Sequence, residues 1–247
     1  MPQSKCFAIL SAVLGTIVIN ATAQGEWVLS IYGGKSITEN GDLELHQRDS
    51  TGLIFEDVSW DDRSFESPLY YGARPSYWLD KWPGWGASLD FTHAKMYLDP
   101  NDTIHVIGAR LGMAVNEPER IGPTIQRFNN SHGLNFLTLN LLHRWFPKGQ
   151  RDDSPLGRLQ PYVGMGVGIT IPHVETTVDN KSTDEYQFGG PALQGLAGLN
   201  YDLFKHLSTF VEYKISYADV DMDIAGGGKI SIEPVTHQFV FGLSARF

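Results

Sequence analysis

Apolar and polar residues alternate with a period of two along most of the chain. Between residues 161 and 171 the odd positions from Val163 to Ile171 are apolar, while the even positions hold glycine, threonine or tyrosine. The segments 209–217 and 238–247 alternate in the same way. Such a period produces a β-strand with one apolar face and one small or polar face. No segment has a clear helical period, so the pattern predicts an all-β protein.

The same alternation predicts eight strands, and the lengths of the connections predict how they are arranged. The strands are expected at residues 26–37, 68–79, 84–97, 132–146, 159–172, 186–201, 207–218 and 234–247. The connections 80–83 and 202–206 are short, whereas 38–67 and 98–131 are long. Short turns at one rim and long loops at the other are typical of outer-membrane barrels. We therefore predict an eight-stranded antiparallel transmembrane β-barrel with longer extracellular loops and shorter periplasmic turns.

The residues on the two strand faces indicate which face meets lipid. The face opposite the apolar stripe carries polar and charged residues: Arg74, Asp90, Asn140, Arg144, Gln160, Gln194, Asn200, Glu212, Lys214 and Arg246. In a soluble, lipocalin-like barrel these residues would face solvent. The apolar face is rich in tryptophan and tyrosine near the strand ends, which favours a membrane barrel with aromatic girdles. The charged residues would then pair inside a lumen that side chains fill, so a solute pore is not expected.

The N-terminal segment predicts export. Lys5 precedes an apolar stretch from Cys6 to Ile19, and Ala21-Thr22-Ala23 fits a cleavage site. We expect a signal peptide at residues 1–23 and a barrel at 24–247, in the bacterial outer membrane. Cys6 is the only cysteine, so the exported chain has no disulfide. The net charge of −9 argues against a nucleic-acid partner.

Several short motifs resemble those of one group of outer-membrane proteins. They are Leu89-Asp90-Phe91-Thr92-His93-Ala94-Lys95, His132-Gly133-Leu134-Asn135, Ile171-Pro172-His173-Val174-Glu175 and Phe210-Val211-Glu212-Tyr213-Lys214. Together they resemble the lipid A oxidase-like barrels of rhizobial-type bacteria. The final strand, ending in Phe247, resembles the signal that engages the barrel assembly machinery. The resemblance implies an oxygen-dependent oxidation of the proximal glucosamine of lipid A from the outer leaflet.

The histidines are the main candidates for chemistry. His93, His132, His173 and His237 are expected at the outer rim, and Glu175 shares a face with His173 if that strand continues. Imidazole and carboxylate ligands suit a divalent metal, with His132, His173 and Glu175 as the expected ligands. However, strand parity places His93 and His237 toward lipid and His132 inward, which opposes a compact site. A rim histidine also suits a membrane interface without any chemistry.

Two functions remain open from the sequence. In an oxidase, His93, His132, His173 and Glu175 would act, with Asp90 as a supporting carboxylate. The alternative is a non-catalytic surface barrel that serves envelope stability or adhesion. In either case the expected partners are outer-membrane lipid, including lipid A or lipopolysaccharide, and the expected state is a monomer. No cofactor other than the divalent metal is expected.

Overall fold

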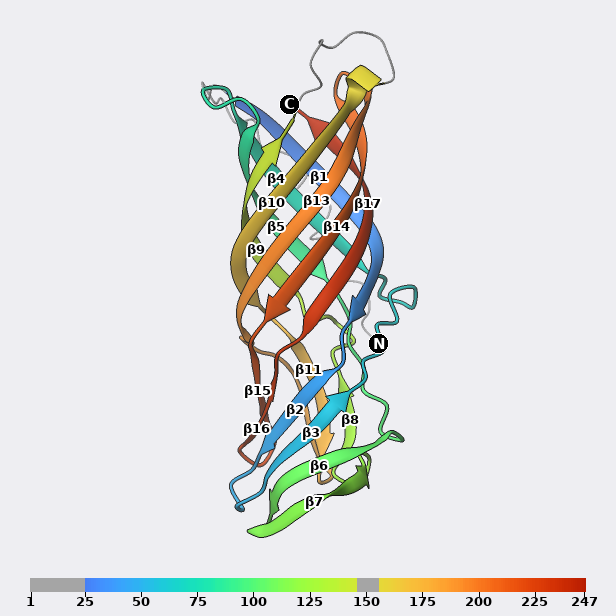
Figure 1. Cartoon of the computed structure of the whole chain (residues 1–247), viewed down its shortest axis with the longest axis vertical. Helices are drawn as coiled ribbons and strands as arrows, with labels where there is room; N and C mark the ends of the chain where they lie inside the picture. Colours follow the sequence, from blue (N-terminus) through green and yellow to red (C-terminus); the bar gives the residue numbers. More distant parts are fainter. Residues whose placement is uncertain (1–24, 146–155) are drawn as a thin grey trace, which may run out of the picture.

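Eight long strands close into an antiparallel barrel in the computed structural model, which describes residues 25–145 and 156–247 (Figure 1). The barrel strands are β1 (Gly25–Thr38), β4 (Tyr71–Leu79), β5 (Trp85–His93), β9 (Phe136–Arg144), β10 (Leu159–Thr170), β13 (Gly190–Phe204), β14 (Leu207–Ala218) and β17 (Val235–Arg246). Strand β1 pairs with both β4 and β17, which closes the barrel. Each strand overlaps one of the eight predicted strands, so the predicted barrel is confirmed. The predicted signal peptide lies outside the described residues.

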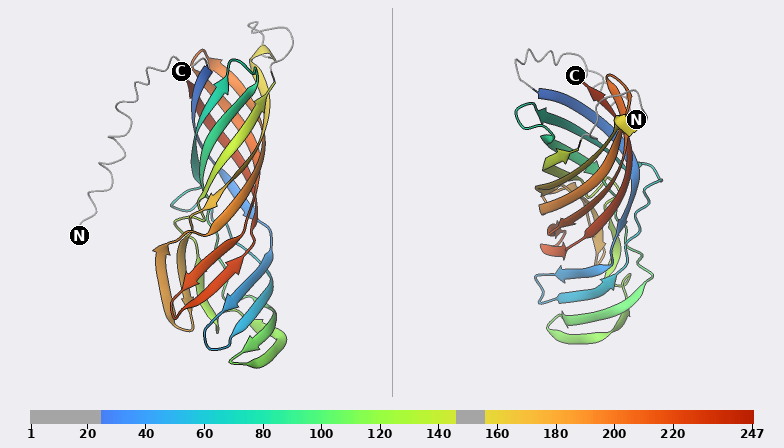
Figure 2. Two further views of the ribbon diagram at one scale, coloured as in Figure 1. Left: turned by 90° about the vertical axis from the view of Figure 1, so that its left-hand side faces the viewer. Right: turned by 45° about the horizontal axis from the view of Figure 1, so that its top comes forward.

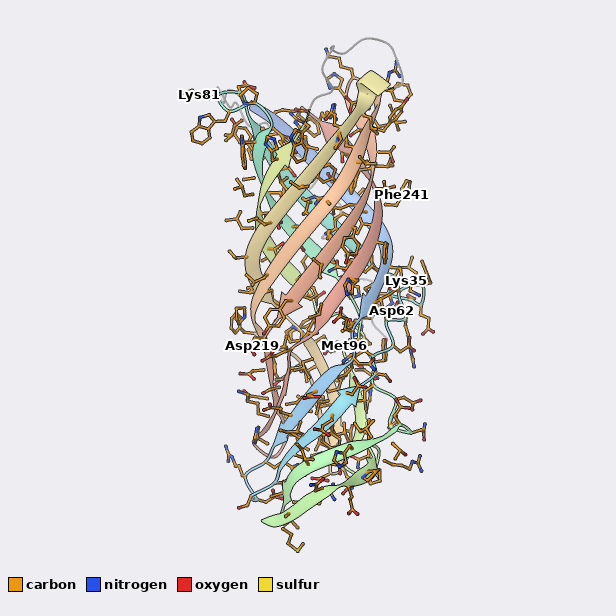
Figure 3. All side chains as sticks on the ribbon, viewed as in Figure 1. Lys35, Asp62, Lys81, Met96, Asp219 and Phe241 are labelled. Atoms are coloured by element: carbon orange, nitrogen blue, oxygen red, sulfur yellow. The ribbon has the colours of Figure 1, made fainter. Side chains whose placement is uncertain are left out.

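The outer surface of the barrel is an apolar band. Ile31, Leu139 and Phe241 each expose 61% of their surface, and Figure 3 shows Phe241 pointing away from the wall. Tryptophans 27, 85 and 145 are exposed near the end that carries the short turns. An apolar band with aromatic residues at its edge is the lipid-facing surface of a membrane barrel. The barrel is therefore a membrane-spanning barrel of the outer-membrane type, and the lipocalin-like alternative is excluded.

The inside of the barrel is polar, as predicted, and its charges are paired. Lys214 Nζ lies 2.7 Å from a carboxylate oxygen of Asp90, and Arg74 lies 2.8 Å from Glu212. The Tyr32 hydroxyl donates to Asp90 and is itself 2.7 Å from Lys214 Nζ. All five residues expose 6% of their surface or less. A closed sheet satisfies the backbone in lipid, and this network fills the narrow lumen at its level.

Among the described residues, nine further strands extend the barrel beyond one rim, at the lower end of Figure 1. A six-stranded sheet contains β2 (Gly41–His46), β3 (Gly52–Val58), β6 (Thr103–Arg110), β7 (Met113–Arg120), β15 (Val220–Ile224) and β16 (Gly228–Ile232). A three-stranded sheet contains β8 (Ile125–Asn129), β11 (His173–Val178) and β12 (Lys181–Tyr186). We call these two sheets the extension. The short turns and the end of β17 lie at the opposite end of the barrel (Figures 1 and 2).

The extension has a large apolar core. Leu45 of β2, Phe55 of β3, Met222 of β15 and Phe128 of β8 are each 0% exposed. They belong to one cluster of buried residues that draws on both sheets and continues into the barrel. Trp60 packs against Phe128 with ring centroids 5.6 Å apart. Full burial of a large apolar side chain contributes about 1.5–3 kcal/mol relative to exposure in water. The extension is therefore a folded unit rather than a set of independent loops.

The long connections differ from the sequence prediction, which placed no strand in residues 38–67, 98–131 or 219–233. The alternation is present there, for example in Val220, Met222 and Ile224, all of which are buried. These strands are only five to eight residues long, not counting the turns that join them. Acidic residues occur within and between them. The acidic composition favoured hydrated loops, but the acidic side chains occupy only the outward face.

Among the described residues, no helix is long and apolar enough to cross a membrane.

Candidate functional site

A turn and a strand pair bring His132 beside the start of β11. His132 lies between β8 and β9, and Gly133 has a φ of +95°, a conformation that glycine adopts without strain. The Gly133 amide donates to the Asn130 carbonyl at 3.0 Å, and the His173 amide donates to the Gly133 carbonyl at 3.0 Å. Strand β11 pairs with β8, with Glu175 opposite Asn129. The turn is thereby fixed to the first residues of β11.

His132, His173 and Glu175 converge on one point, and we call them the rim cluster. Nδ1 of His132 lies 3.1 Å from Glu175 Oε1, and Nδ1 of His173 lies 3.2 Å from the same oxygen. One ligand atom from each residue can be chosen so that all lie within 4.8 Å of one another. The two imidazole rings stand edge to face at 4.8 Å. The structure thus assembles the three residues that the sequence proposed as metal ligands.

Glu175 is held ionised by its surroundings. Its side chain is 6% exposed, and burial, the largest single effect, raises the pKa. Hydrogen bonds from Ser131 and His132, together with the charge of Arg127, outweigh burial and hold the pKa of Glu175 below its usual value. Arg127 binds one carboxylate oxygen, Oε2, while the other, Oε1, accepts from Ser131 and lies next to the two imidazoles. A deprotonated carboxylate is the form that binds a metal.

Two residues of β12 support His173. Asp184 lies 3.3 Å from Nε2 of His173, and the Tyr186 ring packs against the imidazole at 4.4 Å between centroids. A carboxylate at the second ring nitrogen orients a metal-binding histidine and fixes its tautomer. The side chain of His173 is 13% exposed, whereas that of His132 is 59% exposed. The rim cluster therefore has a supported inner side and an accessible outer side.

The other sequence candidates lie elsewhere. His93 is at the outer end of β5, and its Nδ1 lies 3.0 Å from Asn135 Oδ1 rather than in the rim cluster. Asp90 is inside the barrel with Lys214, so the structure does not bring it to the rim cluster. His237 lies on β17, between the Tyr213 hydroxyl at 2.5 Å and Glu39 at 2.6 Å.

One expectation about orientation needs correction. His132 does not point into the barrel, because β9 begins at Phe136 and His132 lies in the turn before it. Strand parity therefore does not apply to His132. His93 shares the outward face of β5 as expected, but it is only 3% exposed. The segment after His132 covers it.

Sequence reasoning missed four residues of the site, Ser131, Arg127, Asp184 and Tyr186. Ser131 adjoins His132 in sequence, which is a weak local signal. Arg127, Asp184 and Tyr186 reach the site only through the pairing of β11 with β8 and β12. Only the sheet of the extension, which the sequence did not predict, could have placed them.

Comparison with known proteins supports the fold. No protein-family model matches the chain, and no curated protein matches it. Among solved structures, a major outer membrane protein from Thermus thermophilus aligns with a TM-score of 0.50 and 12% identity, covering 90% of this chain and 99% of that chain. OprG from Pseudomonas aeruginosa aligns with a TM-score of 0.46 and 17% identity, covering 91% and 97%. The chain has the fold of outer-membrane barrels, and function must be argued from the rim cluster.

Proposed function

We propose that this protein is an outer-membrane enzyme that uses a divalent metal at the rim cluster to modify a lipid of the outer leaflet. The observation that carries the proposal is the convergence of His132, His173 and Glu175 within 4.8 Å. Two histidines and one carboxylate, which leave the other coordination positions of the metal open, are the ligand set of non-haem iron oxygenases. The resemblance to lipid A oxidase-like barrels favours oxidation of the proximal glucosamine.

The donor set fits such a metal. Both Nδ1 atoms lie within 3.2 Å of Oε1, and Oε1 belongs to a carboxylate whose pKa is lowered, so that it is ionised at neutral pH. Asp184 and Tyr186 hold His173, and Arg127 and Ser131 hold Glu175. These outer contacts fix the ligands before a metal arrives, which raises affinity. Iron bound there would supply a centre at which dioxygen is activated.

The reaction is a two-electron oxidation of the sugar. The proximal glucosamine must carry a free hydroxyl group at its anomeric carbon. Loss of two electrons and two protons there converts the sugar to a lactone, and dioxygen takes them up as hydrogen peroxide. Water then opens the lactone to the aminogluconate. The role of this chain is to hold the sugar beside the accessible His132 and to keep Glu175 deprotonated. Asp90 belongs to the ion pairs of the barrel and receives no part in this chemistry.

Metal analysis of the purified protein tests the centre. The wild type, reconstituted with iron, zinc or copper and then desalted, should retain about one metal per chain, in keeping with a three-ligand site. His173→Ala and Glu175→Gln should lose it. His105→Ala is the matched control, because His105 pairs with Glu56 at 2.7 Å outside the rim cluster. Equal retention in all four proteins would disprove a metal centre at the rim cluster.

Mass spectrometry of lipid A tests the reaction. Cells that produce the wild type should contain lipid A with one additional oxygen atom on the proximal sugar. Cells with His173→Ala should not, and cells with His105→Ala should resemble the wild type. Metal retention with unchanged lipid A would reject the oxidase while leaving the metal centre in place.

The second candidate is a non-catalytic surface barrel, and the extension favours it. In the described part of the chain, nine strands enclose apolar residues and form a folded unit beyond the outer rim. Such a unit can present a surface to another cell or molecule. Shortening the β6–β7 hairpin would then change adhesion, while substitution of His173 would not. The reverse result supports the enzyme.

A further inference from the structure

A pocket opens on the outer wall of the barrel beside the rim cluster. It is lined by residues from the wall and from the extension, including Tyr71, Phe91, His93, His132, Ile171 and Tyr186. It encloses about 560 Å³, part of which is open to the surroundings. We call it the wall pocket. His132 belongs to both the wall pocket and the rim cluster, so a ligand in the pocket lies next to the metal ligands.

The wall pocket faces lipid rather than the lumen. Phe91 and His93 continue the outward face of β5 that includes Leu89, which is 47% exposed. Tyr71, the partner of His93 on β4, is also 47% exposed. This face borders acyl chains along the barrel, and the pocket lies at its outer end. A lipid of the outer leaflet is therefore the ligand that can reach the pocket directly.

His93 offers a fixed hydrogen-bond acceptor at this pocket. The amide nitrogen of Asn135 donates to the carbonyls of His132, Gly133 and Ile171, at 3.0 to 3.2 Å. These contacts orient the amide so that Oδ1 faces His93 Nδ1 at 3.0 Å. An amide oxygen only accepts, so Nδ1 of His93 carries the proton and Nε2 has a free lone pair.

That lone pair has no partner in the described part of the chain. His93 is 3% exposed, and its Nε2 is buried without a hydrogen bond. An unsatisfied buried acceptor costs about 1–3 kcal/mol, so a ligand that donates to it is favoured. Tyr71 stacks on the imidazole at 4.8 Å and is half exposed, so a turn of its ring toward lipid is the movement that we expect to open access.

We infer that the wall pocket binds the sugar head group of an outer-leaflet glycolipid, with a hydroxyl group donating to His93 Nε2 beside the rim cluster. An ionised phosphate has only acceptors and cannot make this bond. The faces of Tyr71, Phe91 and Tyr186 provide apolar surfaces for the carbon face of a sugar ring. The inference rests on the proposed function only in making this lipid the substrate. Binding itself requires no metal.

Photocrosslinking in a defined bilayer tests the inference. The full chain would carry benzoylphenylalanine at Tyr186 and, as the control, at Ile37, which is 46% exposed at the outer end of β1. The bilayer would contain one part of a diacylglycerol glucoside to about nine parts of phosphatidylcholine. We expect the glucoside to be enriched at position 186 over position 37 by about two- to tenfold, the value of one net hydrogen bond. Equal proportions at both positions would overturn the inference.

The variant His93→Phe sharpens this test. It keeps an aromatic ring under Tyr71 but removes the acceptor, so the enrichment at position 186 should disappear. Its metal content should equal that of the wild type, because His93 is not in the rim cluster. In His173→Ala the metal should be lost while the glucoside enrichment persists. The two proposals therefore fail separately.

A measurement on the unaltered protein complements the variant. The nitrogen-15 spectrum should show His93 protonated at Nδ1 and unprotonated at Nε2. Addition of the glucoside, but not of phosphatidylcholine alone, should shift the Nε2 resonance. A proton on Nε2 in the absence of glucoside would refute the inference even if the variant failed to fold.

Discussion

The barrel and the extension use the same alternating strands with opposite orientation. In the barrel, Lys214 and Asp90 are 0% exposed inside, while Leu139 is 61% exposed outside. In the extension, Leu45 and Phe55 are 0% exposed inside, while acidic side chains face outward. The period of two is the same in both regions. The surroundings decide whether the apolar face of a strand points outward or inward, because the barrel wall meets acyl chains and the extension meets water.

The comparison also explains where chemistry can arise. Inside the barrel the charged groups are paired with one another and sealed, so they serve packing. At the junction of the two regions the apolar wall ends and the polar outer face of β11 begins. Polar side chains such as Glu175 and His173 can be ordered there while remaining in reach of lipid. The rim cluster and the wall pocket both lie at this junction.

The largest expected effect comes from breaking the ion pairs of the barrel. Lys214→Met leaves Asp90 and Glu212 buried with less compensation, so the free energy of unfolding should fall by about 3–5 kcal/mol. Urea titration in phospholipid vesicles measures it. The double variant Lys214→Met with Asp90→Asn should recover much of the loss, because the uncompensated carboxylate is gone. A double variant no better than the single one would contradict this account.

Removing an apolar side chain should matter more in the extension than on the barrel wall. Leu45→Ala leaves a cavity in a packed core and should cost about 2–5 kcal/mol. Leu139→Ala should cost less, because acyl chains fill the vacated volume. Urea titration gives both values, and limited proteolysis shows whether the extension opens first. Equal costs would mean that the extension core is not tightly packed.

Adding a charge should have the opposite result, with a larger cost on the barrel wall than in the extension. Leu139 and Leu111 are 61% and 60% exposed, but the first faces lipid and the second lies in the β6–β7 turn. Leu139→Arg should cost about 2–4 kcal/mol near the bilayer midplane. Leu111→Arg should change stability by less than about 0.5 kcal/mol. Similar costs for the two arginines would argue against the membrane position of the wall.

The smallest effect is expected at an exposed ion pair of the extension. Burial raises the pKa of Asp221, but Lys229 at 2.5 Å and the Ser231 hydroxyl at 2.6 Å lower it below its usual value of 3.8. A carboxyl whose pKa is lower in the folded than in the unfolded protein stabilises the fold at every pH above its pKa in the unfolded protein. This contribution disappears as the pH falls through its pKa in the folded protein. Both side chains are about half exposed, so Asp221→Asn should cost at most about 1 kcal/mol at pH 7.

Two measurements test the prediction for Asp221. The difference between wild type and Asp221→Asn should vanish at a pH below the folded pKa, when the carboxyl is protonated in both states. At neutral pH it should shrink in about 1 M salt, which screens exposed charges. A difference that grew on acidification would have the wrong sign for this pair.

The sequence predicted the barrel because each wall strand carries its own evidence. Residues 161–171 alternate over a full membrane crossing, and a short turn such as 80–83 fixes the order of the strands it joins. The strands of the extension alternate too, as Leu43 and Leu45 show, but over five to eight residues. So short a pattern does not reveal whether its apolar face is covered. The extension was therefore missed.

The rim cluster was predicted in its residues but not in its geometry. His132 and Glu175 are 43 positions apart, and no hairpin joins them. They meet because β8 pairs with β11 in a sheet outside the barrel. His93 was predicted to act with them, yet its Nδ1 is committed to Asn135. The tautomer that makes His93 an acceptor follows only from those contacts.

By itself, the sequence determined the strand period, the eight wall strands and the residues available for chemistry, because these depend on local alternation and side-chain type. The tertiary structure decided which short strands enclose apolar residues beyond the barrel rim, which imidazoles share a carboxylate and which nitrogen of His93 is free. Those features depend on contacts between segments far apart in the chain. Such contacts form only when burial of apolar surface and pairing of backbone groups are satisfied together.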